Sequence, residues 1–334
     1  MDPVDPVALA RQLIDIDSTT GREGEVAALL AAYLRQRGYS VLEQPLEGQR
    51  SNVIAAVGEP RVVFSTHFDC VPPFFPSRIE GNRLYGRGAC DAKGILAVQV
   101  AAAERLRAEG ETRVGLVFVA GEERGSDGAA AANRVASPSK YLINGEPTDN
   151  RLGVATRGVL RLRLKASGRA AHSGYPELGE SAIEKLLDVL ISLRTVAWPD
   201  DELLGKTHYT IGLIKGGVTA NIIPPHAEAE VMFRTVGRHD EVRQKLRTVV
   251  DGRVGIEEVI EVPPVQLKTL PGFSTGVFAF ATDIPLLNNW GTPLLLGPGS
   301  IHVAHTDDEH VGLGELDEAV SLYKKLARQL LAAP

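Results

Sequence analysis

The sequence is poor in cysteine and has no long run of apolar residues. It contains only Cys70 and Cys90, which cannot form a disulfide framework, and this favours a reducing compartment. No apolar stretch approaches the roughly 20 residues that a membrane-spanning helix requires. The segment MDPVDPVALA lacks the basic region and apolar core of a signal peptide. We therefore expect a cytoplasmic protein without a membrane span.

Positive charge is also scarce. The 36 lysine and arginine residues are outnumbered by 42 acidic residues, which gives a formal net charge of −6, and no run is rich in Lys or Arg. This balance argues against nucleic acid or an anionic membrane as a main partner. Internal repeats and low-complexity tracts are lacking as well. At 334 residues the chain exceeds the length at which single cores usually stop growing, so we expect two domains.

Two patterns of expected elements divide the chain. Residues 1–156 and 266–334 follow an α/β pattern, whereas residues 157–265 run strand, helix, strand, strand, helix, strand, an order that resembles a ferredoxin-like sandwich. The sequence therefore predicts a first domain of 1–156 and 266–334 with a second domain, 157–265, inserted into it. Expected helices span 5–14, 23–37, 93–108, 179–195, 239–252 and 313–331, and the main expected strands span 39–46, 51–57, 61–67, 113–120, 139–144, 158–168, 207–215, 226–235 and 255–262.

The expected strand at 158–168 alternates cleanly between apolar and polar residues. Such alternation leaves one face or edge of the inserted domain open, and an open sheet edge is a template for pairing with another chain. We therefore expect a homodimer that forms through the inserted domain.

The expected strand at 61–67 ends in two groups that can carry chemistry. His67 and Asp69 lie two residues apart, so in an extended chain their side chains point to the same side. Ligands of open α/β sheets bind at this carboxyl end of the strands. A histidine beside a carboxylate suits a metal ligand with the group that orients it. The alternative is a strand-end histidine capped by a surface aspartate.

Other expected strand ends and loops supply further ionisable groups. Asp91 lies in the glycine-rich segment GRGACDAKG, although it could simply cap the following helix. Glu122 and Glu123 follow the strand at 113–120; adjacent side chains point in different directions, so one can bind a metal while the other acts as a base. Their alternative role is to cap a helix near residue 126. Glu146 follows the strand at 139–144.

Histidine and carboxylate ligands without cysteine suit catalytic zinc, or cobalt or manganese. The collected candidates are His67, Asp91, Glu123, Glu146 and His305, where His302 is a competitor for His305. Five ligands exceed what one tetrahedral zinc takes, but two ions that share one carboxylate would use them. Asp91 is the candidate bridge. Two such ions polarise a carbonyl and activate a water, which leaves Glu122 free as general base.

Together these motifs resemble those of the co-catalytic di-zinc deacylase and exopeptidase family, which includes acetylornithine deacetylase, succinyl-diaminopimelate desuccinylase, aminoacylase and the glutamate carboxypeptidases. The matching segments are His67-Phe68-Asp69, GRGACDAKG, Gly121-Glu122-Glu123, Glu146 and Ala304-His305-Thr306-Asp307-Asp308-Glu309. The resemblance covers essentially the whole chain. It implies a zinc-exopeptidase-like catalytic domain with a mixed sheet between helices, and an inserted lid and dimerisation domain.

The resemblance also implies a role for each residue. One metal would be held by His67 and Glu146 and the other by Glu123 and His305. Asp91 would bridge them, Glu122 would act as the base, and Asp69 would orient His67. In the lid, His172 would reach the substrate carbonyl across the dimer, and Asn221 and Arg234 would hold the substrate carboxylate or the transition state. Gly297 and Gly299 are expected at the substrate.

The lid residues also have plainer explanations. His172 could be an ordinary turn residue, Arg234 a salt-bridge partner at a sheet edge, and Asn221 part of a turn before Pro224. Cys70 and Cys90 could contact metal, but small buried residues suit their positions better.

The expected activity is metal-dependent hydrolysis of the amide bond of an N-acyl amino acid. Within the family, the acetylornithine and acetyl-lysine deacetylases of arginine and lysine biosynthesis are the nearest fit. Desuccinylation of succinyl-diaminopimelate and cleavage by a dipeptidase or carboxypeptidase are alternatives. A non-catalytic metal-binding sensor or scaffold is an alternative of another class, although it would have no need of Glu122.

Overall fold

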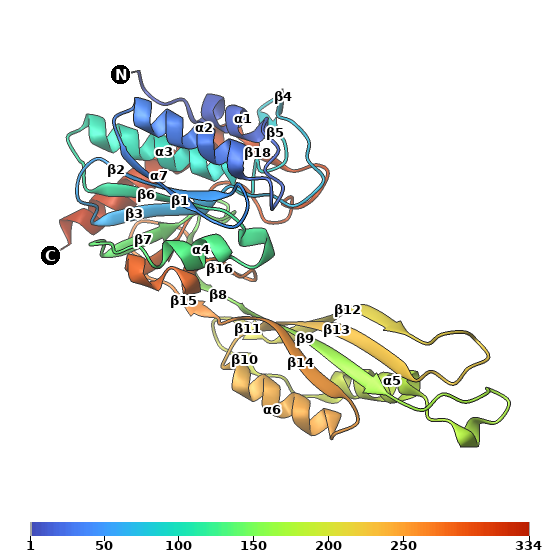
Figure 1. Ribbon diagram of the computed structural model, residues 1–334. Helices are drawn as coiled ribbons and strands as arrows, with labels where there is room; N and C mark the ends of the chain where they lie inside the picture. The colour runs from blue at the N-terminus through green and yellow to red at the C-terminus, as the bar shows by residue number, and fades with distance from the viewer. Residues whose placement is uncertain (1, 334) are drawn as a thin grey trace. The chain divides into compact units, whose positions relative to one another are not determined.

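The computed structural model describes residues 2–333 and divides into two compact units. The catalytic unit comprises the chain up to Val154, Leu267–Gly276 and the chain from Thr282 on, and the inserted unit comprises Ala155–Gln266 and Val277–Ala281. In Figure 1 the catalytic unit carries both the blue and the red end of the chain. Residues 277–281 thus belong to the inserted unit, although they follow Leu267–Gly276 of the catalytic unit in the chain.

A six-stranded mixed sheet forms the centre of the catalytic unit. Its order is β1 (Ser40–Pro45), β2 (Ser51–Ala56), β6 (Val114–Val119), β3 (Val62–His67), β7 (Tyr141–Asn144) and β17 (Thr292–Leu295). β6, β3, β7 and β17 are parallel, whereas β1 and β2 are antiparallel to their neighbours. Every residue of β3 and β6 is buried, as expected of strands that are covered on both faces. The prediction of an α/β fold with a mixed sheet is confirmed.

Alternate strand residues contact different layers of helices. Phe64 of β3 belongs to the main core cluster, which also contains residues of α1 (Pro6–Ile14), α2 (Gly24–Gln36), α3 (Lys93–Ala108) and α7 (Leu313–Ala332). The neighbouring Val63 belongs to a second cluster that includes α4 (Asp127–Ala132) and Trp290 of the 3₁₀ turn η5 (Asn288–Trp290). Figure 1 shows α1, α2 and α3 on one side of the sheet and α4 on the other. Of the described helices, none has the length and apolarity to span a membrane.

The helix ends follow local chemistry that the sequence predicts. Asp5 caps α1 by accepting the Val7 N–H at 2.9 Å, and Pro6 occupies the first helical position, where no N–H is needed. Beyond the end of α2, Gly38 adopts a φ of 82°, which suits a glycine much better than any other residue.

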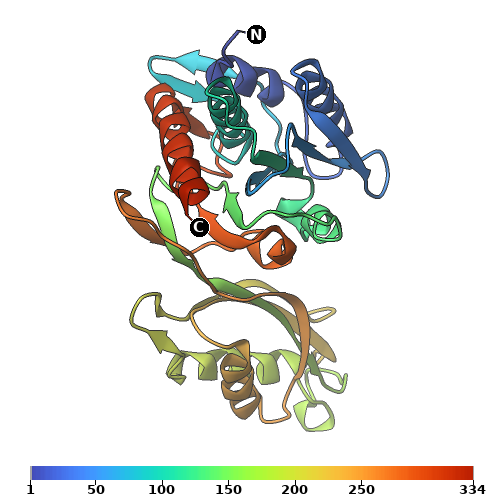
Figure 2. The same ribbon diagram turned by 90° about the vertical axis from the view of Figure 1, so that its left-hand side faces the viewer.

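The inserted unit has the predicted strand and helix order. β9 (Gly158–Ser167), α5 (Ala182–Ser192), β12 (His208–Gly216), β13 (His226–Thr235), α6 (His239–Val250) and β14 (Gly255–Val262) form a four-stranded antiparallel sheet in the order β12, β13, β9, β14. Alternate residues of β9, such as Leu160, Leu162 and Leu164, pack with residues of both helices. The clean alternation of this strand therefore reflects one buried face. Figure 2 shows the same unit turned by 90°.

Several short elements complete the chain. The segment at 72–88 forms two short strands, β4 (Arg78–Glu80) and β5 (Arg83–Tyr85), and β5 also pairs with β18 (His310–Gly312). This pairing holds the loop before β18 beside the loop after β5. The other short elements are β8 (Leu152–Thr156), β10 (Asp200–Asp201), β11 (Gly205–Lys206), β15 (Val265–Gln266), β16 (Thr275–Phe278), η1 (Glu122–Arg124), η2 (Pro176–Leu178), η3 (Leu193–Thr195) and η4 (Ile284–Leu286).

Candidate metal centre

His67 is the last residue of β3, and its side chain is buried. Its Nε2 lies 3.0 Å from Oδ1 of Asp91, while its Nδ1 lies 3.1 Å from the carbonyl oxygen of Asp69 and 3.5 Å from the Oδ1 of that residue. The Asp69 side chain is fully buried, so the alternative of a surface aspartate is wrong. Of the two Asp69 groups, the carbonyl is nearer to the histidine ring than the carboxylate.

The Asp69 carboxylate also holds the loop that carries the two glutamates. Its Oδ1 accepts the Glu122 N–H at 3.0 Å, and its Oδ2 accepts the Glu123 N–H at 3.2 Å. The hydroxyl of Thr20 donates to the same Oδ2 at 2.8 Å. Asp69 therefore links the end of β3 to the turn after β6. Sequence reasoning missed Thr20, which lies far from the metal motifs in the chain.

Asp91 lies between two histidines and turns one carboxylate oxygen to each. Its Oδ1 is 3.0 Å from Nε2 of His67, and its Oδ2 is 3.1 Å from Nε2 of His305. The same nitrogen of His305 lies 2.9 Å from Oε1 of Glu123. Helix α3 begins after Ala92 and has no side-chain cap, so the alternative role of Asp91 as a helix cap is wrong. A carboxylate with one oxygen on each side can bridge two cations.

Two groups of possible metal ligands share Asp91. The first consists of His67, Asp91 and Glu146 and the second of Asp91, Glu123 and His305, and within each group the ligand atoms lie within 4.8 Å of one another. These are the residues that the sequence assigns to the two ions. Oε1 of Glu146 is buried and has no hydrogen-bond partner among residues 2–333, as suits an atom that binds a metal ion. The donor set therefore fits two divalent cations, whose binding stays a prediction.

The alternative candidates for metal ligands, His302, Cys70 and Cys90, lie outside both groups. His302 is exposed and belongs to neither. Cys70 and Cys90 are buried free thiols whose pKa values are raised by burial, to about 12 for Cys70. Neither thiol joins a ligand group within the described part of the chain. Their positions agree with the expectation of small buried residues.

Glu122 stands apart from the ligand groups although it is next to Glu123 in the sequence. Both belong to the 3₁₀ turn η1, which two glycines with positive φ, Gly121 and Gly125, separate from β6 and α4. Glu123 faces His305, whereas the Glu122 carboxylate has no hydrogen bond or ion pair within residues 2–333. No side chain caps α4, so the alternative role of the two glutamates as helix caps is wrong.

Burial and crowding shift the pKa values of these groups in opposite directions. Burial raises the pKa of Glu122 and Glu146 well above the usual range, and neighbouring carboxylates add to the effect. Hydrogen bonds with Asp91 and Glu123 raise the pKa of His305 to about 10. Burial opposes ionisation of Asp91, but the bonds from His305 and His67 lower its pKa overall. The neighbouring carboxylates therefore favour the protonated form of His305, in the position where a cation would bind.

The glycines predicted at the substrate are closely surrounded by the chain itself. A Cβ on Gly297 would lie 2.4 Å from the carbonyl oxygen of Glu146, and one on Gly299 would lie 2.7 Å from the sulfur of Cys90. Gly299 also has a φ of 79°. Close packing and backbone conformation thus require glycine at both positions. Contact of either residue with substrate stays a prediction.

The three remaining candidates belong to the inserted unit. His172 and Asn221 lie in two loops that pair, because Ser173 donates to the Asn221 carbonyl at 3.0 Å and residue 172 bridges to Ile222. Nδ1 of His172 accepts the Gly174 N–H at 3.1 Å, and Oδ1 of Asn221 accepts the Thr219 hydroxyl at 2.7 Å. Local turn contacts therefore explain part of each position, and catalytic roles for both stay predictions.

Arg234 is not a salt-bridge partner at a sheet edge, so the alternative explanation for this residue is wrong. It lies on β13, which is between β12 and β9 and so is not at a sheet edge. Its side chain makes no ion pair within the described residues, and burial lowers the pKa of its guanidinium. A half-buried cation without an acidic partner suits an anionic ligand.

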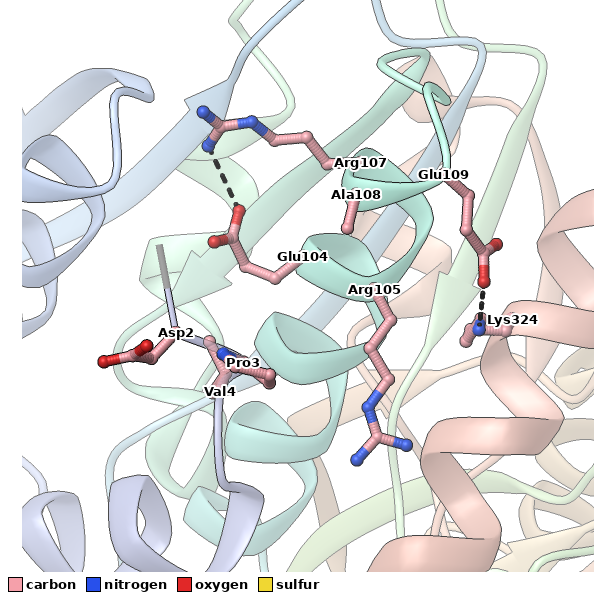
Figure 3. A pocket seen from close by; sticks show the side chains of 9 residues that line it. All are labelled: Asp2, Pro3, Val4, Glu104, Arg105, Arg107, Ala108, Glu109 and Lys324. Atoms are coloured by element: carbon pink, nitrogen blue, oxygen red, sulfur yellow. Dashed lines mark hydrogen bonds and ion pairs between the residues drawn. The ribbon is translucent and has the colours of Figure 1, made fainter.

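A surface hollow elsewhere on the catalytic unit contains none of these residues. Its walls are formed by Asp2, Pro3, Val4, Glu104, Arg105, Arg107, Ala108, Glu109 and Lys324 (Figure 3). Two ion pairs lie along it, Arg107 with Glu104 at 3.2 Å and Lys324 with Glu109 at 2.7 Å. Its polar groups thus largely satisfy one another, and the chemistry of this unit is concentrated around Asp91.

Comparison with known proteins identifies the family to which the chain belongs. Residues 63–329 match the model of the peptidase family M20/M25/M40, so the chain belongs to this family of metallopeptidases, which are hydrolases that act on amide bonds. It is 38% identical to a peptidase M20 domain-containing protein of Schizosaccharomyces pombe, over 96% of this chain and 83% of the relative. It is 35% identical to a probable carboxypeptidase of Aspergillus clavatus, over 96% and 81%.

The fold is shared with solved structures of low sequence identity. The crystal structure of aminopeptidase PepT from Bacillus cereus superposes with a TM-score of 0.79 at 20% identity, and the match covers 98% of both chains. The match therefore spans the folds of both units of this chain.

Replacement of Asp91 by alanine tests the bridge. Because Asp91 belongs to both ligand groups, Asp91→Ala should remove more metal than the loss of Glu146, which belongs to one group. Metal analysis of purified Asp91→Ala and Glu146→Ala proteins measures this. Loss of a single ion in both variants would show that Asp91 does not bridge.

The raised pKa of His305 predicts how metal binding depends on pH. A cation must displace the proton of His305, which is held up to pH about 10 in the metal-free protein, so raising the pH lowers the cost of binding. Between pH 6 and pH 8 the apparent affinity for Co²⁺ should rise by about tenfold per pH unit for each displaced proton. Calorimetry in buffers of different ionisation enthalpy would count these protons. An affinity independent of pH would contradict the arrangement.

Proposed function

We propose that this protein hydrolyses the amide bond of small N-acyl amino acids, as acetylornithine and acetyl-lysine deacetylases do, with two divalent cations, zinc in the first place and cobalt or manganese as substitutes. One observation supports this most directly. Two ligand groups share Asp91, and the adjacent glutamate of η1, Glu122, is left outside both groups. A metal-binding scaffold would need the ligands, but it would have no use for a free carboxylate beside them.

In this proposal His67 and Glu146 hold one cation, Glu123 and His305 hold the other, and Asp91 contacts both. Cations held by these residues would polarise the amide carbonyl and lower the pKa of a bound water. Asp69 keeps the ligands in place from outside, because it accepts the N–H groups of Glu122 and Glu123 and lies beside His67.

Glu122 serves as the general base and then as the general acid. Its carboxylate takes a proton from the attacking water and transfers it to the nitrogen of the leaving amine. Burial raises its pKa above the usual range, which favours acceptance of the proton from water. This step needs a carboxylate that is not itself bound to a cation.

The inserted unit supplies the groups that recognise substrate. The His172 side chain donates to the oxygen that gains negative charge, and one such donor contributes roughly 2.7–4 kcal/mol to the transition state. Arg234 and Asn221 bind the carboxylate of the amino-acid part, a role that suits the half-buried and unpaired guanidinium of Arg234. Gly297 and Gly299 allow the chain to approach the substrate closely.

A homodimer through the inserted unit belongs to the same proposal. β12 is an edge strand of its sheet, and it exposes 52% of Leu213 and 55% of Ile214. On α5, Leu187 and Ile191 are also exposed. An open edge beside exposed apolar side chains suits a second copy of the chain. Two free thiols fit a reducing compartment, and we place the protein in the cytoplasm.

Cleavage of peptides is the second candidate activity, as a carboxypeptidase or dipeptidase. It is favoured by the similarity to the Aspergillus clavatus protein that is named a probable carboxypeptidase. The same site would serve, because both substrates place an amide next to an amino acid with a free carboxylate. A panel of acetyl, succinyl and glutamyl amino acids and dipeptides, assayed with zinc and with cobalt, separates the two. No turnover of any member would favour a sensor or scaffold.

Glu122→Gln tests the division of labour between the two glutamates. The variant should keep nearly full metal content but lose on the order of 10²–10⁴ in kcat, the usual contribution of general acid–base catalysis. Glu123→Gln is the matched control and should lose metal. If Glu122→Gln loses a metal and Glu123→Gln does not, the two roles are reversed.

Subunit mixing tests whether His172 acts in the neighbouring site. His172→Ala and Glu122→Gln, each inactive alone, are mixed under conditions that exchange subunits. If the histidine acts across the dimer, a mixed dimer has one site with both defects and one with neither, so activity returns toward half of wild type per mixed dimer. If it acts in its own subunit, mixing restores nothing. A fully active monomer would also contradict this role.

A further inference from the structure

The Glu309 side chain is completely buried and joins two loops that each carry a proposed ligand. It lies four residues after His305, and its Oε1 accepts three backbone N–H groups from the loop that contains Asp91. The donors are Gly88 at 2.9 Å, Cys90 at 3.2 Å and Asp91 itself at 3.1 Å. One carboxylate oxygen thus holds the backbone of the residue whose side chain faces both histidines.

Arg87 balances the charge of Glu309 without touching Asp91. Its guanidinium donates to Oε2 of Glu309 at 2.6 Å and to the carbonyl of Pro73 at 3.1 Å, and it stacks over the ring of Phe75. The two oxygens of Glu309 therefore have separate tasks. Oε2 accepts from the buried guanidinium of Arg87, and Oε1 accepts from N–H groups of the Asp91 loop.

We infer that Glu309 is a positioning residue for the metal centre: its carboxylate holds the Asp91 backbone so that the two oxygens of Asp91 face the two ligand groups. This inference rests on the proposed function, because it concerns the same centre. An amide in place of the carboxylate has one acceptor instead of two and turns an NH₂ group towards either Arg87 or the three N–H donors. Such a change loosens the loop at the point where it supplies the shared ligand.

The rival explanation is that Arg87 and Glu309 form an ion pair that only stabilises the fold. Breaking a buried pair leaves an unpaired charge and destabilises a protein, whereas replacing both partners by uncharged residues is often tolerated. The double variant Arg87→Met/Glu309→Gln therefore separates the explanations. It removes the unpaired charge, but it does not restore the carboxylate that holds Asp91.

The experiment measures thermal unfolding and Co²⁺ binding of the full chain, by calorimetry and by the visible absorption of cobalt. Glu309→Gln should lower the melting temperature and weaken Co²⁺ binding by about 10- to 100-fold, the usual effect of losing a residue that orients metal ligands. The double variant should recover melting temperature but retain the weakened binding and an altered cobalt spectrum. Glu104→Gln, which breaks the partly buried pair with Arg37 toward the C-terminal end of α3, is the matched control and should bind Co²⁺ as wild type does.

Recovery of both stability and Co²⁺ affinity in the double variant would overturn the inference, as would unchanged Co²⁺ binding in Glu309→Gln. The proposed function can fail separately. If the wild-type protein binds Co²⁺ but hydrolyses no member of the substrate panel, the proposed activity is wrong while the role of Glu309 in positioning the centre still stands. If it binds no Co²⁺, both are wrong.

Discussion

Carboxylates that are gathered in one buried pocket repel each other, and positive charge must be supplied to hold them there. Around Asp91 the chain supplies little of it. The nearby arginines form ion pairs with acidic residues that are not proposed metal ligands. Arg87 pairs with Glu309, and Arg50 pairs with both Glu23 and Asp127. No lysine or arginine makes an ion pair with the proposed metal ligands within the described residues. Asp91 pairs there with His67 and His305, and Glu123 pairs with His305.

Asp69 and Glu309, which surround the centre, have a different role from the carboxylates that are proposed as metal ligands. Asp69 and Glu309 use their oxygens mainly to accept backbone N–H groups, and each thereby holds a loop that carries a proposed ligand. Hydrogen bonds of this kind do not need a cation, so the backbone around the centre is ordered by the protein itself. Ligands held in this way lose less conformational freedom when an ion binds. The carboxylates that are proposed as metal ligands remain available for the ions.

The fold and the composition of the candidate site could largely be predicted from the sequence, because both depend on local patterns. Buried strands read as unbroken apolar runs, and His67 follows from its place at the end of such a run. The contact of Thr20 with Asp69 could not be predicted, since it depends on where a remote loop passes. Nor could the pairing of β5 with β18, because strands of three residues have too few positions to show a period.

The same limit applies to the inserted unit. Its strand and helix order follows from the alternation, but the pairing of the loops around His172 and Ile222 joins residues that are far apart in the chain. Arg234 was a plausible edge residue until the strand order placed β13 between two neighbours. Strand order is a property of the assembled sheet and is not encoded in any one strand.

Because of the position of the insertion, the inserted unit is synthesised before the last part of the catalytic unit. β7 pairs with β17 in a parallel arrangement, yet the whole inserted unit lies between them in the chain. A ribosome therefore completes β9 to β14 before it reaches β17, His305 or α7. Until then β7 lacks a neighbour on one side, and the second ligand group lacks its histidine. The inserted unit has its own core and domains generally fold as units, whereas the metal centre can be assembled only when the last part of the chain has been made.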